Sequence, residues 1–332
     1  RPGPGSFVVA AVAAGEGARA GSGLRGAGDI DFLNAHVEGD QFVFLPDSII
    51  GPFLAFTHKE SSADDLPQAD ASNGTLHFHP KEERLTISSG KEPIGLFKAE
   101  SFLSGDLVVE VEGLSGAGYL DMKKAALEAP DFAFKESLAT TEHAAFELYG
   151  SHSSLAAFET ENVRGEVDFE NRRGEFIPNS GETAIELPIQ QYLCYMDRFR
   201  WFMDEDEIDL ISERDTESLP LNFSENRSLS NFISTHPDQD SLHFLSTHAT
   251  YLVGDDVLQC KGVKEIAVAD SRVFPDSGNV IIRRDADMER LTAARIITNA
   301  TTQHHLIENA SIDIEGRYAF NGSGEYQYRG ID

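Results

Sequence analysis

Residues 191–212 read QYLCYMDRFRWFMDEDEIDLIS, and this stretch decides what fold to expect. Apolar residues stand at alternate positions from Phe199 to Met203, around the only tryptophan, Trp201, and again from Ile208 to Leu210. A period of two is typical of a β-strand with one buried face. The unbroken acidic run Asp204–Glu207 separates the two halves. The stretch therefore predicts a β-hairpin with Trp201 in the core and a charged tip in water.

The same alternation recurs along most of the chain, in short runs separated by Gly, Asn, Asp, Ser or Pro. Helical periodicity is confined to 121–128 and 285–297, and the second segment also parses as two strands around a turn. We therefore expect an all-β fold. Representative runs are DIDF (29–32), QFVF (41–44), TLHFH (75–79), LVVEVEG (107–113), EVDFE (166–170), EIAVA (265–269), NVIIR (279–283) and SIDIEG (311–316).

A faint repeat accompanies these runs. A glycine followed by an alternating strand occurs at Gly28, Gly74, Gly118 and Gly165, in steps of 46, 44 and 47 residues. Strand–turn units of irregular length favour a β-solenoid-like or stacked β-layer architecture. Turn signals every 8–12 residues also fit two β-sandwich domains, which is the alternative.

Composition divides the chain into four regions. The Gly/Ala-rich N-terminal region is expected to be a disordered fragment end, and its apolar run Phe7–Ala14 is the longest in the chain, too short to span a membrane. A polar region with Pro220 and Pro237 predicts a subdomain boundary or a long excursion. The β-rich regions on either side of it are expected to share one continuous core. The regions are 1–27, 28–211 (β-rich), 212–242 (polar) and 243–332 (β-rich).

The charge of the chain excludes some partners. With 56 acidic and 27 basic residues the formal net charge is −29, which disfavours nucleic acid and anionic lipid. Dispersed acidic residues with only nine Lys against eighteen Arg indicate adaptation to high salt, where screening makes such a surface tolerable. Cys194 and Cys260 lie in apolar runs and are expected to be buried free thiols, not part of a disulfide scaffold.

Metal sites have weak candidates only. The acidic run fails the calcium-loop pattern, because Ile208 and Asp209 stand where an oxygen ligand and a glycine are required. Two histidines of TLHFHP alternate on one strand and can share a face, as a transition-metal site requires. No resident cofactor is expected, and calcium is the alternative. The candidate ligands are His77, His79, Asp204, Asp206, Asp238 and Asp240.

Catalytic signatures are missing from the sequence. It contains no G-x-S-x-G, P-loop or dinucleotide fingerprint, and neither cysteine has a motif around it. Acid/base chemistry needs two carboxylates with separated pKa values. Among the carboxylates, those that stand within strand-like runs are Asp168, Asp270 and Asp276, and Arg272 is nearby in the sequence. These four residues are the candidates if the chain is an enzyme. The sequence favours a protein that is not an enzyme.

From about residue 162 to residue 328 the amino-acid sequence resembles segments of large, repetitive, β-rich cell-envelope proteins of outer-membrane bacteria. No activity is established for that group. The resemblance implies an extracytoplasmic location (periplasm, outer membrane or cell surface) and a piece of a longer repetitive chain. The partners that it implies are another envelope protein or further repeats of the same chain. It carries no catalytic residue onto this sequence. The matching phrases are NVRGEVDFENRRGEF, ELPIQQYLCYMDRFRWFMDEDEIDL, FISTHPDQDSLHF, KEIAVADSRVFPDSGNVII and NATTQHHLIENASIDIEGRYAFNGSGEYQY.

Three functions follow as hypotheses. The first is a non-enzymatic structural or binding module of the cell envelope. The second is a carbohydrate-active β-helix enzyme that cuts polysaccharide with clustered Asp side chains. The third is an amphiphile-carrying β-groove lined by Phe. The structural alternative to this groove is that the 22 Phe rings fill an ordinary hydrophobic core.

Overall fold

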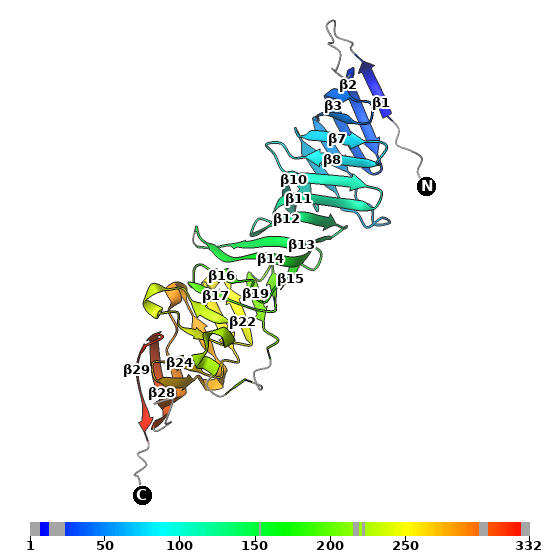
Figure 1. Ribbon diagram of the computed structural model, residues 1–332. Helices are drawn as coiled ribbons and strands as arrows, with labels where there is room; N and C mark the ends of the chain where they lie inside the picture. Colours follow the sequence, from blue (N-terminus) through cyan, green and yellow to red (C-terminus); the bar gives the residue numbers. More distant parts are fainter. Residues whose placement is uncertain are drawn as a thin grey trace. The chain divides into compact units, whose positions relative to one another are not determined.

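The computed structural model describes residues 7–12, 24–152, 154–214, 219–220, 223–298 and 305–326. The chain is all-β, as its alternating pattern predicts (Figure 1). Within the described residues, the only helical segments are six 3₁₀ turns of three residues each. The two candidate helical segments are strands and turns: 121–128 joins two paired strands, and 285–297 leads from a 3₁₀ turn into another strand.

The chain divides into two compact units. The first comprises residues 1–145 and 164–172, and the second comprises 146–163 and 173–332. Two long strands, β13 (Leu138–Tyr149) and β14 (Ala156–Asp168), each contribute residues to both units.

The first unit is a ladder of antiparallel strands that splits and rejoins. One half of β3, Ala35–Glu38, pairs with β5, while Val43 and Phe44 pair with β4. The branch β5–β6–β9 and the branch β4–β7–β8 then meet again on β10. The strands are β1 (Phe7–Val12), β2 (Leu24–Phe32), β3 (Ala35–Phe44), β4 (Ile49–Pro52), β5 (Ala55–His58), β6 (Ala69–Ser72), β7 (Thr75–His79), β8 (Arg84–Ser88), β9 (Ile94–Leu96), β10 (Ser101–Glu110), β11 (Gly113–Asp121) and β12 (Ala125–Phe134).

One of the repeat glycines has a clear structural role. Gly118 of β11 lies directly opposite Gly105 of β10. A Cβ atom on Gly118 would lie 2.4 Å from the carbonyl oxygen of Ser104, and one on Gly105 would lie 2.1 Å from that of Ala117. Gly118 also has φ +131°, which L side chains rarely adopt. The close approach of the two backbones therefore requires glycine on both strands.

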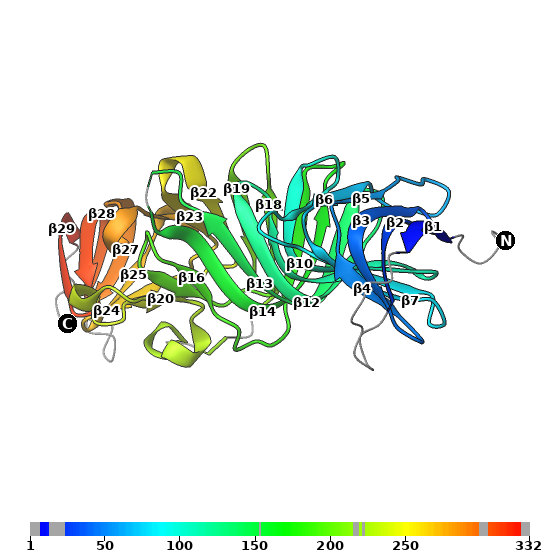
Figure 2. The same ribbon diagram turned by 90° about the horizontal axis from the view of Figure 1, so that it is seen from above.

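The second unit repeats the split. Starting from β14 and the adjacent β15, one branch runs β15–β18–β19–β22–β23–β26 and the other runs β16–β17–β20–β21–β24–β25–β27–β28–β29. The chain places strands alternately in the two branches, mostly as hairpins, and Figure 2 shows the run β25–β27–β28–β29. The strands are β15 (Arg173–Pro178), β16 (Ile185–Leu187), β17 (Tyr192–Cys194), β18 (Arg198–Phe202), β19 (Glu207–Ile211), β20 (Phe232–Ser234), β21 (His243–Phe244), β22 (His248–Leu252), β23 (Val257–Lys261), β24 (Ile266–Val268), β25 (Ser271–Phe274), β26 (Val280–Ile282), β27 (Leu291–Thr298), β28 (His305–Gly316) and β29 (Ala319–Tyr326).

The two branches of the second unit meet across a buried core. Cys194 lies in one branch and Cys260 in the other, and both are free and buried, as the sequence predicts. Burial raises the pKa of both thiols well above the ordinary value, and the proximity of Cys194 adds to the shift at Cys260. The thiols therefore act as small apolar core residues.

The hairpin predicted from residues 199–210 is confirmed. β18 pairs with β19, with Trp201 opposite Ile208, and the indole is 1% exposed. Asp204 and Glu205 are exposed at the tip, whereas Asp206 and Glu207 are half-buried. The acidic run is thus only partly in water, because Glu207 already belongs to β19 and pairs with Leu252 of β22.

Two regional expectations can be set beside the structure. Within 1–27, the expected disordered or fragment N-terminus, residues Phe7–Val12 form β1 and the strand β2 begins at Leu24; 1–6 and 13–23 lie outside the described residues. The region 212–242 lies inside the second unit and is not where the units divide. Its described part is an excursion with the 3₁₀ turns η1 (Phe223–Glu225), η2 (Arg227–Leu229) and η3 (Pro237–Gln239) around β20.

Candidate functional site

A cavity with a largely polar lining lies in the first unit and holds about 400 Å³. Four connecting segments form it: the residues after β5, the turn between β9 and β10, the turn between β12 and β13, and the turn after β14. The lining residues are Glu60, Gln68, Phe97, Lys98, Glu100, Glu136, Ser137, Phe169 and Glu170.

The floor of this cavity is apolar. The rings of Phe97 and Phe169 stack with centroids 4.2 Å apart and an interplanar angle of 22°. The backbone N–H of Phe169 donates to the carbonyl oxygen of Ser137 at 2.9 Å, which ties the turn after β14 to the turn between β12 and β13. Phe97 and Phe169 are 6% and 7% exposed, so they offer little surface to the cavity and no open stacking platform.

The rim is acidic but partly neutralised. Lys98 pairs with Glu60 at 3.1 Å, and Arg172 pairs with Glu100 at 2.6 Å. Ser62 donates a hydrogen bond to Glu136 at 2.5 Å. A carboxylate rim over an apolar floor fits a positively charged group better than an anion.

The turn between β9 and β10 has an uncommon backbone. Phe97, Lys98 and Ala99 all have positive φ, at 51°, 58° and 63°. Three consecutive non-glycine residues in the left-handed region cost free energy, and such geometry persists only where the surroundings hold it. Here the burial of Phe97 against Phe169 and the Lys98–Glu60 pair hold the turn.

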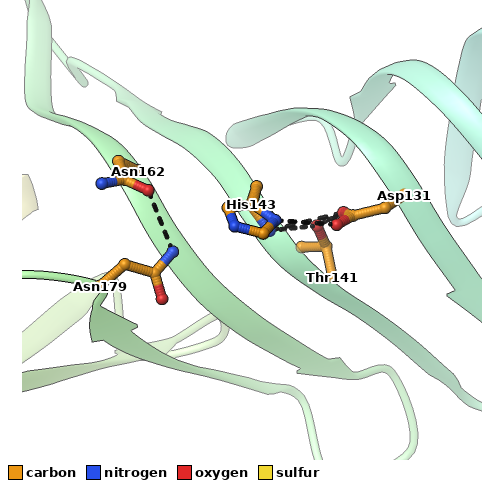
Figure 3. Close-up of polar contacts among 5 residues, drawn as sticks. All are labelled: Asp131, Thr141, His143, Asn162 and Asn179. Atoms are coloured by element: carbon orange, nitrogen blue, oxygen red, sulfur yellow. Dashed lines mark hydrogen bonds and ion pairs between the residues drawn. The ribbon is translucent and has the colours of Figure 1, made fainter.

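A second polar group lies on β12 and β13, where Asp131 accepts hydrogen bonds from Thr141 and His143 (Figure 3). Burial alone would raise the pKa of Asp131. The hydrogen bonds from Thr141 and from the side chain and backbone N–H of His143, together with the charge of His143, outweigh burial and hold the pKa below its usual value. Thr141 donates to Asp131 directly, so His143 is not placed as a base for its hydroxyl. The group therefore joins neighbouring strands and does not have the geometry of a nucleophile with its base.

Figure 3 also shows a contact within the second unit. The side-chain amide of Asn179 donates to that of Asn162 at 3.1 Å, and the Asn179 backbone N–H donates to the Asn162 carbonyl oxygen at 3.0 Å. Asn162 has φ +55°, a conformation that asparagine tolerates better than most residues. This contact holds an irregular position in β14.

Of the four candidate catalytic residues, Asp168 serves a turn. It accepts from the backbone N–H of Asn171 at 2.8 Å and from the Asn171 side chain at 2.7 Å. Asp side chains in turns commonly accept hydrogen bonds from backbone N–H groups a few residues later. Asp168 belongs to the first unit, whereas the other three candidates belong to the second.

Arg272 is engaged with a residue that the sequence did not single out. Its guanidinium pairs with Glu265 at 3.4 Å, both side chains being less than 10% exposed, and Ser224 donates to the same carboxylate at 2.6 Å. This buried pair attaches η1 to the neighbouring sheet. Asp270 and Asp276 lie in the turns that precede and follow β25, each hydrogen-bonded to the adjacent serine.

The candidate metal ligands are likewise dispersed. Asp204 and Asp206 lie at the hairpin tip, and Asp238 and Asp240 lie in and just after η3. Among the residues that the structure describes, no three His, Cys, Asp or Glu gather as a metal site. His77 and His79 do lie side by side, with ring centroids 4.0 Å apart.

The cavity residues were missed by sequence reasoning for a physical reason. Glu60, Lys98, Glu136 and Glu170 come from four turns spread over more than a hundred residues, and no local motif links them. Comparisons with protein-family models, with curated proteins and with solved structures found no match for this chain.

Proposed function

We propose that this chain is a non-enzymatic structural or binding module of a bacterial cell envelope, part of a larger repetitive protein. The observation that carries the proposal is the sealed aromatic core of the second unit. Phe146 contacts Phe158, Phe176, Phe199 and Trp201, with ring centroids 4.5–5.8 Å apart, and each of these side chains is at most 1% exposed. Rings packed in this way stabilise a scaffold, and these five side chains present almost no surface of their own to a cargo.

The finer architecture in this proposal is a stack of β-layers, solenoid-like in its repetition. Supporting it, the chain mostly adds one hairpin to each branch in turn, as with β16–β17, β18–β19, β20–β21 and β22–β23. Each hairpin extends its own branch by two strands. Such a plan grows by repetition without a change of local pairing, as repeat proteins do.

The location in this proposal is extracytoplasmic, and the partners are other envelope proteins or further repeats of the same chain. The acidic composition is consistent with a location exposed to high salt, where screening reduces the repulsion between like charges. No helix in the described part of the chain is long and apolar enough to cross a membrane.

Cell fractionation tests the location. An antibody raised against this chain should detect its parent protein in the envelope fraction of the source cells, together with outer-membrane markers. Detection with cytoplasmic markers alone would overturn the proposal.

Two activity assays test the competing functions. A fluorescent fatty acid should show no saturable binding, because the rings of the core contact one another; a stoichiometric complex would favour amphiphile carriage. Polysaccharides incubated with the chain should yield no new reducing ends, with or without calcium. Release of reducing ends from any polysaccharide would favour the carbohydrate-active alternative. The candidate catalytic residues would then be substituted one at a time and the variants assayed: Asp168, Asp270, Asp276 and Arg272.

A further inference from the structure

The imidazoles of His77 and His79 form a pair on the outer face of β7. The residues that alternate with them, Leu76 and Phe78, are 3% and 2% exposed and point into the core. Because side chains alternate along a strand, both imidazoles project from the opposite face. Their centroids lie 4.0 Å apart with the rings tilted by 45°. The sequence indicates a shared side, and the structure adds the short distance.

The strands on both sides hold this pair in place. β7 pairs with β4 and with β8, so its backbone is fixed along its length. Thr86 lies opposite His77 on β8, and Arg84 lies opposite His79. The Arg84 guanidinium is 3.5 Å from the Glu110 carboxylate, which reduces its repulsion of a cation. Because the backbone under both imidazoles is fixed before binding, only side-chain rotations lose conformational entropy when a metal ion binds.

We propose that His77 and His79 bind one divalent transition-metal ion of the class that prefers imidazole, Cu²⁺ most tightly and Zn²⁺ or Ni²⁺ less. Imidazole nitrogen suits these ions, and copper stands at the top of the affinity order for divalent first-row metals. Calcium and magnesium prefer oxygen ligands and are not expected here. Since the described residues offer no third His, Cys, Asp or Glu to this pair, solvent completes the coordination.

Copper titration tests the pair directly. Untagged chain, stripped with chelator, is titrated with copper sulfate by calorimetry, and the complex is examined by electron paramagnetic resonance. We expect one Cu²⁺ per chain at this pair with two nitrogen ligands, and at least about tenfold weaker binding in His77→Gln and in His79→Gln. The matched control is His143→Gln, which removes an exposed histidine bonded to a carboxylate and should leave the affinity unchanged. Equal affinity in His77→Gln and the unmodified chain would overturn the proposal.

Adding a third metal-binding side chain beside the pair tests the proposed site a second way. Thr86→His places a third imidazole opposite His77 on the same face, so Zn²⁺, added as zinc chloride, should bind at least about tenfold more tightly. Circular dichroism and a thermal melt without metal establish that the variant folds. A folded Thr86→His chain that binds zinc no more tightly than the unmodified chain would contradict the shared face and with it the site.

Discussion

Trp201 is the residue at which the hairpin and the aromatic core meet. It lies on β18, contacts Phe146 with ring centroids 5.8 Å apart, and is 1% exposed. Trp201→Ala should lower the free energy of unfolding by about 3–5 kcal/mol, because it removes a large buried side chain and leaves a cavity. Denaturant unfolding followed by circular dichroism measures the change. A loss below about 1 kcal/mol would contradict the burial of the indole in a rigid core.

His58 makes the stability of the first unit depend on pH. The imidazole is 1% exposed, and its Nδ1 lies 2.9 Å from the carbonyl oxygen of Pro67. Burial lowers the pKa of His58 below the ordinary value of 6.5, and the Pro67 carbonyl only partly opposes the shift. As the pH falls below 6.5 the unfolded chain therefore binds a proton before the folded chain does, and the free energy of unfolding decreases.

The variant His58→Gln isolates this contribution. Glutamine stays neutral, so the free energy of unfolding of the variant should fall less steeply between pH 7.5 and 5 than that of the unmodified chain. Urea unfolding at several pH values gives both curves. Parallel curves would show that His58 does not titrate with a lowered pKa.

At the scale of single elements, the turn between β9 and β10 contains backbone strain that a substitution can relieve. Ala99 is exposed and has φ +63°, which glycine adopts without the steric cost that alanine meets. Ala99→Gly should raise the free energy of unfolding by about 0.5–1 kcal/mol. The matched control is Ala133→Gly on β12, an exposed strand position, where glycine should cost about 0.5–1 kcal/mol. Thermal or denaturant melts that show the same sign for both variants would contradict the left-handed turn.

The acidic tip of the β18–β19 hairpin is the other element with a direct test. Glu205→Gln with Glu207→Gln should change the free energy of unfolding by less than about 1 kcal/mol, since Glu205 is exposed and Glu207 is half in solvent. Millimolar calcium should not shift the melting temperature of either form. A calcium shift that the double variant loses would show that the tip is a calcium site.

At the scale of the whole molecule, the last strand offers an open edge. In the described part of the chain β29 pairs with β28 alone, and most of its side chains are exposed, including Tyr326 at 46%. An unpaired strand edge is a template for pairing with another chain. The net charge of −29 repels a second copy at low salt, and screening weakens that repulsion. We therefore expect the mass measured by light scattering to rise with concentration at high salt.

Charge on the edge should prevent this association. Asn321→Glu with Ser323→Glu places like charges on β29, whereas Ser154→Glu with Ser180→Glu adds the same charge on exposed loops. Only the first pair should keep the chain monomeric. A strictly monomeric unmodified chain at high concentration and high salt would contradict an adhesive edge.

Much of the fold follows from the sequence because local rules govern it. Alternation at 199–203 and 208–210 specifies two strands and their buried faces, since side chains of a strand point to opposite sides in turn. The burial of Cys194 and Cys260 follows in the same way from their apolar surroundings. The N-terminal strand β1 was missed because its Gly/Ala-rich flanks lack such alternation, and β1 forms by pairing with β2.

The sequence by itself determined the all-β class, the hairpin around Trp201, the buried thiols and the acidic surface, because each depends on neighbours within a few residues. Only the tertiary structure decided how the strands are shared between two branches and where the chain divides. It also decided which carboxylates meet: the rim of Glu60, Glu100, Glu136 and Glu170 over the stacked rings of Phe97 and Phe169. Strand pairing over long separations has no local signature, since any apolar face can pack on another. The side chains that share a cavity are therefore chosen by the register of the ladder and not by their spacing in the chain.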